Sequence, residues 1–423
     1  MSDHQAASEG AQASGFLDVQ GLGRLLKRAA ELDAADALAG FRERFLLPDS
    51  LVYLDGNSLG ALPAAVPGRL GEVVGREWGE LLIRSWDESG WWSAPERIGD
   101  LIAPIVGASA GRIVVGDSTS VNIFKALVAA ARRLDELAGD HGRDELLVDA
   151  STFPTDGYIA RSAARMTGLR VVPVDPAELP GRVGPATAVV LVNHADYRSG
   201  RLHDLPGITE AVHAAGALVV WDLCHSAGAL PVDLDTHGVD YAVGCTYKYL
   251  NGGPGAPAFL YVAQTHQATF DSPLPGWNSH ADPFGMTAQY RPAEGAARGR
   301  VGTPDILSML SLEAALGVWE DVSIEAVRAK SLALTDFFLE CVEAYVPAGR
   351  VQPITPLNHA ERGSQVALRV PAGDAGPLMQ KLIARGVVGD FRRPDVLRFG
   401  FTPLYVSFAD AERAARVLGH ISE

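Results

Sequence analysis

The stretch ALVVWDLCHSAGALPVDLDTHGVDYAVGCTYKYLNGGPGAPAFLYV (217–262) decides the fold. It contains three short apolar runs, at 217–222, 241–245 and 258–262, in which apolar residues do not alternate with polar ones. Runs of this kind suit strands that are buried on both faces, as in a parallel sheet covered by helices. Asp222 closes the first run and Lys248 follows the second, so ionisable residues stand at the ends of two expected strands.

The same succession of short apolar runs continues in the part of the chain that precedes residue 217. Apolar runs at 112–116, 145–150, 170–174 and 188–192 are separated in places by helical stretches such as NIFKALVAAARRLDELA (122–138). Together the seven runs predict an α/β layer sandwich, with a mostly parallel seven-stranded sheet between helices. Because only a short Gly/Pro-rich segment joins the last two runs, we expect one strand of that pair to run antiparallel.

Four segments are predicted along the chain. Residues 1–15 have neither an apolar core nor a basic start, which indicates a disordered tail rather than a signal peptide. Residues 16–60 are predicted to form a helical segment that joins a smaller domain, and residues 61–305 are predicted to form the large α/β domain. Residues 306–423 predict the smaller α+β domain, with one long helical stretch and three strand candidates (311–346; 365–370, 387–391 and 396–401).

Composition and charge argue against several classes of partner. The chain has 51 Asp and Glu against 36 Lys and Arg, a net charge of −15 with no basic run, so nucleic acid and anionic membranes are not expected partners. No apolar stretch is long enough to span a bilayer. Three scattered cysteines suit a reducing, cytoplasmic location, and no metal site is expected because no His/Cys cluster has convincing ligand spacing.

Polar residues follow the expected strands, at the sheet edge where ligands bind in open α/β folds. The run at 112–116 is followed by Asp117, Ser118, Thr119 and Ser120, which lead directly into a helix. Asp117, Ser118 and Ser120 could simply cap that helix, or the hydroxyls and free N–H groups could hold a phosphate. Lys248 alone could be a solvated lysine. Asp222 lies 26 residues before it, however, and a carboxylate that keeps a pyridine ring protonated, with a lysine for a Schiff base, is the pair that pyridoxal chemistry needs.

Five segments resemble the kynureninases, within the class V aminotransferase-like group. They are YLDGNSLGALP (53–63), STFPTDGY (151–158), 221–262, PGWNSH (275–280) and RFGFTPLYVSF (398–408). The resemblance runs from about residue 20 to the C-terminus. It implies fold type I of the transferases that depend on pyridoxal 5′-phosphate (PLP), with PLP as the cofactor. It also implies hydrolysis of L-kynurenine at its Cβ–Cγ bond to anthranilate and L-alanine, in tryptophan catabolism.

The resemblance implies roles for individual residues. Lys248 would carry the cofactor, Asp222 would pair with its pyridine nitrogen, and Tyr247 would reach the phosphate and act as a general acid. The other cofactor-binding residues would be Thr119, Ser120, Phe153, Asp156, Asn193 and His225, with Trp277 and Thr303 entering from the second subunit of a homodimer with shared active sites. The substrate-binding residues would be Arg398 on the α-carboxylate, Asn57, Ser58, Gly302 and a tryptophan, for which Trp86 is the candidate beside Trp91 and Trp92.

Alternatives remain open from the sequence. Another class V PLP enzyme, such as a cysteine desulfurase, needs a nucleophilic cysteine on a mobile loop, whereas Cys224 and Cys245 lie beside strands and Cys341 lies in a helix. A metal hydrolase could use Asp222, Cys224 and His225, but it lacks a second ligand cluster. A non-catalytic homologue would have no need of the Asp222 and Lys248 pair.

Because Gly302 offers no side chain to a ring hydroxyl, L-kynurenine is expected to be preferred over its 3-hydroxy derivative.

Overall fold

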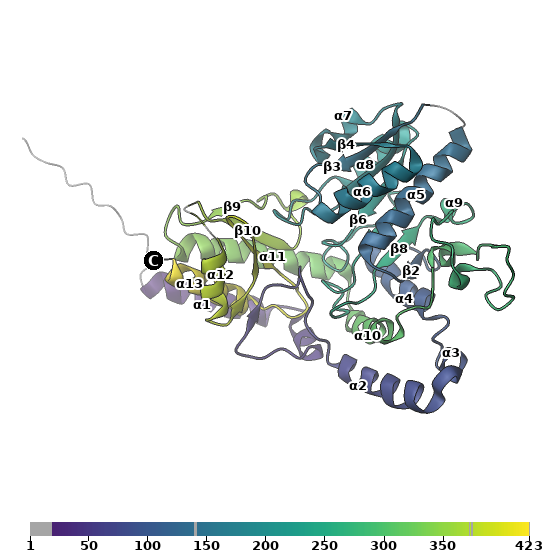
Figure 1. Ribbon diagram of the computed structural model, residues 1–423. Coiled ribbons are helices and arrows are strands. Elements are labelled where there is room, and N and C mark those ends of the chain that lie inside the picture. The colour runs from purple at the N-terminus through teal and green to yellow at the C-terminus, as the bar shows by residue number, and fades with distance from the viewer. Residues whose placement is uncertain (1–18, 139–141, 372, 374, 423) are drawn as a thin grey trace, which may run out of the picture.

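The computed structural model describes residues 19–138, 142–371, 373 and 375–422, and it shows a large and a small lobe (Figure 1). The large lobe is built on a seven-stranded sheet in the order β2-β8-β7-β6-β5-β3-β4. Its strands are β2 (Ile113–Val115), β3 (Glu145–Asp149), β4 (Arg170–Val174), β5 (Thr187–Asn193), β6 (Leu218–Asp222), β7 (Tyr241–Gly244) and β8 (Phe259–Val262). The tail expected at 1–15 lies outside the described residues.

The pairing of the strands confirms the predicted sheet. Strands β4, β3, β5, β6 and β7 are parallel to their neighbours, whereas β8 runs antiparallel to both β7 and β2. The seven apolar runs therefore correspond to seven strands, and the antiparallel member belongs to the last pair.

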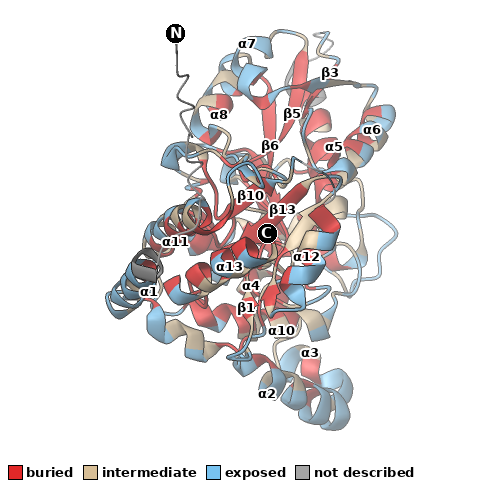
Figure 2. Ribbon diagram, turned by 90° about the vertical axis from the view of Figure 1, so that its left-hand side faces the viewer, coloured by how far each residue is buried: buried red, intermediate tan, exposed pale blue. Residues whose placement is uncertain are grey.

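Helices cover both faces of this sheet, which explains why its central strands are mainly apolar, whereas the edge strand β4 is partly exposed. Alternate residues of β5 enter two different cores: Val189 and Leu191 face one, and Val190 and Val192 face the other. The first core is closed by α5 (Thr119–Ala138) and α6 (Pro154–Thr167). The second is closed by α4 (Ala94–Ile102), α8 (Leu205–Ala214) and α10 (Ile306–Leu316). Figure 2 shows the central strands buried between these layers.

The small lobe combines two small sheets with helices. An antiparallel sheet has the order β12-β13-β10-β9, and a two-stranded parallel sheet pairs β1 with β11. The strands are β1 (Val52–Tyr53), β9 (Gln352–Pro353), β10 (Gln365–Arg369), β11 (Val387–Val388), β12 (Asp390–Arg392) and β13 (Val396–Gly400). The helices are α1 (Val19–Ala34), α11 (Ile324–Tyr345), α12 (Ala375–Ile383) and α13 (Phe408–Ile421), and α13 packs against the other three.

Two expectations for the C-terminal region were wrong in detail. The helical stretch at 311–346 is broken, because α10 ends at Leu316 and α11 begins after Ser323, whose hydroxyl caps it by accepting from the backbone N–H of Ala326. The single strand expected at 387–391 is two strands in different sheets. Gly389 separates them, and a Cβ there would lie 2.7 Å from the carbonyl oxygen of Arg398, so only glycine permits this close approach.

An arm projects from the large lobe at the bottom of Figure 1. It comprises α2 (Ala65–Glu72), the π-helix η2 (Val73–Leu81), η3 (Leu82–Arg84) and α3 (Ser85–Glu88). The remaining short helices are η1 (Ala39–Arg44), η4 (Ala103–Val106), η5 (Pro176–Glu178), α7 (Leu179–Arg182), α9 (Gln264–Gln267), η6 (Trp277–Ser279), η7 (Gly295–Gly299), η8 (Gly317–Trp319) and η9 (His359–Glu361). Among the described residues, no helix has both the length and the apolar character needed to cross a membrane.

Candidate active site

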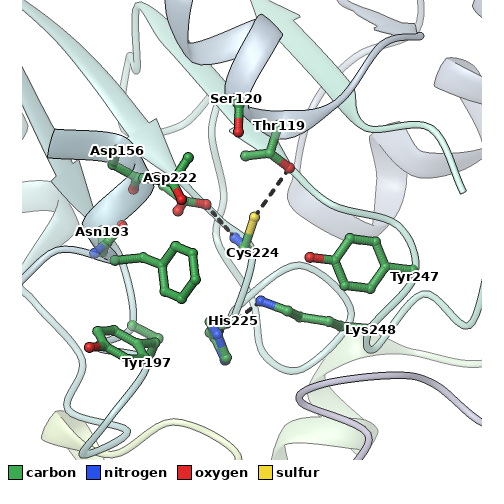
Figure 3. Close-up of a pocket in the computed structure, with 13 residues that line it drawn as sticks. Thr119, Ser120, Asp156, Asn193, Tyr197, Asp222, Cys224, His225, Tyr247 and Lys248 are labelled. Carbon is green, nitrogen blue, oxygen red and sulfur yellow. Dashed lines mark hydrogen bonds between the residues drawn. The ribbon is translucent and has the colours of Figure 1, made fainter. Parts of the chain in front are cut away.

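A pocket opens at the carboxyl ends of β5, β6 and β7 (Figure 3). Register explains how side chains from separate strands meet there, because Asn193 at the end of β5 pairs directly with Asp222 at the end of β6. Strand β7 then leads to Tyr247 and Lys248. The pocket is lined by Thr119, Ser120, Phe153, Thr155, Asp156, Asn193, Ala195, Tyr197, Asp222, Cys224, His225, Tyr247 and Lys248.

Two carboxylates lie side by side on one side of the pocket. The backbone N–H of Cys224 donates to Oδ1 of Asp222 over 2.7 Å. With its amide oriented to satisfy both acids, Asn193 places Nδ2 3.1 Å from Oδ2 of Asp222 and 3.2 Å from Oδ2 of Asp156. Burial, followed by the charge of Asp222, raises the pKa of Asp156 well above its usual value. Burial therefore favours the protonated form of Asp156.

Lys248 and His225 form a hydrogen-bonded pair on the opposite side. The Nζ atom of Lys248 lies 3.0 Å from Nε2 of His225. Burial and then the positive charge of Lys248 lower the pKa of His225 well below its usual value, so the imidazole is neutral and its Nε2 can accept a hydrogen bond from the lysine amine. Its Nδ1 is buried and meets no hydrogen-bond partner in the part of the chain that the structure describes.

A helix N-terminus and a phenol complete the pocket. Helix α5 begins at Thr119, so its first N–H groups have no acceptor within the helix and can receive an anion. The hydroxyl of Thr119 lies 3.6 Å from Sγ of Cys224. Burial, with a further contribution from Cys245, raises the pKa of Tyr247, so its phenol keeps its proton at neutral pH.

Comparison with known proteins assigns the chain to a family. Residues 327–418 match the family model described as the kynureninase C-terminal domain. The chain is 51% identical to a kynureninase of Deinococcus radiodurans, with 90% of this chain and 93% of that one covered. It is 47% identical to a kynureninase of Burkholderia pseudomallei, with 93% and 95% covered. The chain belongs to the kynureninase family.

Solved structures agree on the fold of this kynureninase-family chain. A cysteine desulfurase from Thermococcus onnurineus matches with a TM-score of 0.75 and 18% identity, over 90% of this chain and 97% of that one. A C-DES variant with glycine covalently linked to its PLP cofactor matches with a TM-score of 0.76 and 19% identity, over 89% and 98%. The expected fold class, that of fold type I PLP enzymes, is confirmed.

The residues of the pocket fit PLP. Lys248 offers an amine, Asp222 a charged carboxylate for a pyridine nitrogen, and the start of α5 a set of free N–H groups for a phosphate. Phe153, the residue before α6, lines the same pocket and offers a ring for stacking. The described residues contain no group of three or more His, Cys, Asp or Glu side chains that could hold a metal.

Three of the expected substrate-binding residues lie just behind the pocket rather than on its wall. Arg398 is fully buried, with Asp390 accepting from both its Nε and its Nη2. It also donates to the carbonyl oxygen of Tyr197, a pocket residue, and to the hydroxyl of Ser58 over 3.0 Å. Asn57 is buried as well. Arg398 therefore contacts the pocket through the backbone of Tyr197, and its charge also acts on His225.

The residues expected from the second subunit, and those at the ring end, lie elsewhere in the chain. Trp86 packs against Trp92, which in turn packs against Trp277. Gly302 and Thr303 line a separate cavity. None of these expected site residues lines the pocket within one chain.

Tyr197 and Asp390 belong to the pocket or its support, and the sequence did not identify them as site residues. Cys224 lines the pocket too, although the sequence suggested it only for a metal hydrolase. Tyr197 could have been found, because it follows the end of β5 by four residues, where ligands bind. Asp390 carries no local signal, since only the cross-strand pairing of β12 with β13 places it opposite Arg398.

Proposed function

We propose that this protein hydrolyses L-kynurenine to anthranilate and L-alanine, with PLP held at Lys248. The observation that carries the proposal is the pocket itself. In a chain about half identical to kynureninases, Lys248, the charged Asp222 and the open N-terminus of α5 converge on one cavity. When bound, the cofactor supplies an electron sink for the substrate carbons next to its amino group.

The residues of the chain supply the proton transfers. Lys248 is placed to remove and return the proton at the substrate's Cα, and neutral His225 keeps that amine oriented through the 3.0 Å hydrogen bond. Tyr247 retains its proton and is placed to act as a general acid. Water adds to the γ-carbonyl carbon, the Cβ–Cγ bond breaks, and Cβ takes up a proton to become the methyl group of alanine.

Arg398 is our candidate for binding the α-carboxylate of the substrate, with Asn57 and Ser58 beside it. A guanidinium suits a carboxylate because its N–H groups match the two oxygens in a planar fork. The contact of Arg398 with Tyr197 supports this role, because a shift of that pocket residue would expose the Nη1 atom to the cavity.

We further propose a cytoplasmic homodimer in which Trp277 and Thr303 complete the site of the partner subunit. Trp277 is 39% exposed at the start of η6, and neither residue lines the pocket of its own chain. Three buried free cysteines suit a reducing compartment. Gly302, with Trp86, Trp91 or Trp92, would then face the ring of the substrate and favour L-kynurenine over 3-hydroxykynurenine.

A cysteine desulfurase is disfavoured by the thiols as well as by the family. All three cysteines are buried. Cys224, which does line the pocket, has its pKa raised well above the usual value by a hydrogen bond with Cys245 and by burial, so it is not a ready nucleophile.

The test is an assay of the purified holoprotein, with anthranilate fluorescence and alanine measured from L-kynurenine and from 3-hydroxykynurenine side by side. Lys248→Ala should abolish turnover and borohydride-dependent fixation of the cofactor to the chain. Lys381→Ala, at an exposed lysine of α12, is the matched control and should behave as wild type. Absence of turnover in the wild type, or retained fixation in Lys248→Ala, would refute the proposal.

A further inference from the structure

Behind the N-terminus of α5 lies a buried lysine that the proposed mechanism does not use. Lys125 is 1% exposed, and its Nζ donates to Oδ2 of Asp117 over 2.8 Å and to the carbonyl oxygen of Gly299 over 2.6 Å. Burial lowers the pKa of Lys125, and the charge of Asp117 opposes that effect. The ammonium is therefore stabilised chiefly by one carboxylate.

That carboxylate lies next to the first turn of α5 in the chain, and together with Lys125 it lines the cavity beside Gly302 and Thr303 rather than the pocket of Thr119 and Ser120. Asp117 directly precedes the segment Ser118–Ser120, and its φ of 55° places it in the left-handed region that residues other than glycine rarely adopt. Its backbone is held by β8 on one side, since the N–H of Ala258 donates to its carbonyl oxygen over 2.9 Å. The side chain is held on the other side by Lys125.

The position of Asp117 raises an electrostatic problem for an anion site. A carboxylate beside the first turn of a helix opposes the binding of a phosphate dianion at that same turn, because like charges repel. Asp117 has a side chain that is 31% exposed, so solvent screens only part of its charge. Lys125 supplies the compensating charge and draws the carboxylate toward the interior.

We propose that Lys125 is a positioning residue for the cofactor phosphate: its ammonium neutralises and pins Asp117, so that the turn at Ser118–Ser120 accepts a dianion. The inference rests on the proposed function, since it concerns the phosphate of PLP. It assigns Lys125 no contact with the cofactor.

A comparison of PLP with pyridoxal, which lacks the phosphate, isolates this role. Lys125→Met keeps the length of the side chain and removes its charge, leaving Asp117 uncompensated. We expect the Kd of the apoprotein for PLP to rise at least about tenfold, equivalent to ~1.4 kcal/mol. The Kd for pyridoxal should change by less than about twofold, because a purely structural loss would weaken both ligands alike.

Lys330 offers a matched control in the small lobe. It is 8% exposed, and its Nζ contacts Oδ2 of Asp36 at 2.6 Å and the carbonyl oxygen of Pro403 at 2.5 Å, the same arrangement of one carboxylate and one carbonyl. Lys330→Met should lower stability without changing the ratio of the two dissociation constants. If Lys330→Met and Lys125→Met change that ratio equally, the inference is wrong.

Two further variants test the charge argument and remain informative if Lys125→Met fails to fold. Asp117→Asn keeps a side chain that tolerates a positive φ, and it should bind PLP at least as tightly as wild type. The double variant Lys125→Met/Asp117→Asn is again neutral and should regain most of the lost affinity for PLP. Weaker binding of PLP by Asp117→Asn, or no recovery in the double variant, would overturn the inference.

The proposed function and this inference fail in different ways. If the wild-type apoprotein does not bind PLP, both the proposed function and the role of Lys125 are wrong. If the wild type binds PLP and Lys125→Met binds it equally well, only the role of Lys125 is wrong.

Discussion

At the scale of single residues, Asp156 and Asp222 show how a pocket gives the same side chain two different states. Both are buried, and one asparagine is placed to donate to both of them. Burial and the charge of its neighbour raise the pKa of Asp156, which favours the protonated form of that carboxyl group. Asp222 accepts from the backbone N–H of Cys224, which fixes the direction of its side chain. The two carboxyl groups therefore lie in different environments, although they are neighbours.

This difference predicts unequal effects of two similar substitutions. Asp156→Asn replaces a protonated carboxyl by a neutral amide, so kcat should stay within about tenfold of wild type, ~1.4 kcal/mol. Asp222→Asn removes the carboxylate that, in the proposed function, would keep the pyridine ring protonated, and kcat should fall at least about a hundredfold, ~2.7 kcal/mol. Steady-state kinetics at saturating cofactor measure both. Equal losses would show that the proton does not reside on Asp156.

The sequence could predict some of these residues and not others. Lys248 and Asp222 were accessible because each follows an apolar run, and parallel strands bring such ends together. Lys125 and Asp390 were not. The first looks like any helical lysine until its burial is known, and the second depends on a cross-strand pairing in the small lobe.

At the scale of elements, the predictions of strands and helices from the sequence were correct where burial gives the segment an apolar pattern. The strands of the large sheet that are covered on both faces are mainly apolar, and the partly exposed edge strand β4 also carries an apolar run, so all seven strands were visible in the sequence. Their order was not, because crossover connections carry no local signal. The break between α10 and α11 was also missed, since apolar residues continue through Gly317–Trp319 while Asp321 turns the chain with a φ of 64°.

Asp240, a buried carboxylate directly before β7, allows a prediction of how the stability of the folded protein depends on pH. It accepts from the backbone N–H of Val219 and lies 2.9 Å from Nε2 of His213 and 2.8 Å from Nε2 of His266. The hydrogen bond with Asp240 raises the pKa of His213 above its ordinary 6.5. Although burial opposes it, hydrogen bonds from both histidines lower the pKa of Asp240 below its ordinary 3.8.

The directions of these two pKa shifts define the pH range in which the contacts of Asp240 stabilise the fold. The contribution of His213 is complete below about pH 6.5 and is lost as pH rises through its raised pKa. That of Asp240 is complete above about pH 3.8 and is lost only as pH falls through its lowered pKa. His213→Gln keeps a donor without a titrating charge, so the advantage of wild type should be largest near pH 6 and fade by pH 9. Because the side chain of His213 is 39% exposed, we expect less than about 1 kcal/mol, and urea unfolding midpoints at both pH values measure it. A constant difference between the two proteins would contradict the assignment.

At the scale of the whole molecule, the described chain presents apolar surface that a monomer would leave in water. On the arm, Trp78 is 55% and Ile83 77% exposed. On the loop after η6, Phe284 is 71% and Met286 80% exposed. Trp92 packs against Phe284 at 5.6 Å between ring centroids, which connects this loop to the base of the arm. Large exposed apolar groups of this kind mark interaction surfaces.

The proposed homodimer would cover this surface with a second copy of the chain. Gly302 and Thr303 line a cavity together with Asn278, which belongs to η6, so the loop segments expected to enter a partner's site adjoin the exposed aromatic residues. The sequence could predict that such segments exist from their resemblance to the family. It could not predict the arm, because η2 and α3 look like an ordinary amphipathic segment until their lack of covering neighbours is seen (Figure 2).

Substitutions on this surface should therefore separate assembly from folding. Ile83→Glu and Phe284→Glu each place a charge where an apolar contact is expected, and the dimer Kd should rise at least about tenfold because a buried unpaired charge is costly. Activity should fall in parallel with dimer content, since each pocket would lose the residues supplied by its partner. Met166→Glu is the matched control: Met166 is 64% exposed on α6, which lies at the far end of the large lobe from the arm. Sedimentation velocity and the anthranilate assay over the same range of protein concentrations provide both measurements. If the wild type is a fully active monomer, the arm and the loop do not form an interface, and the pocket must be complete within one chain. If Met166→Glu dissociates the dimer as readily as Phe284→Glu, the arm and the loop do not form the interface.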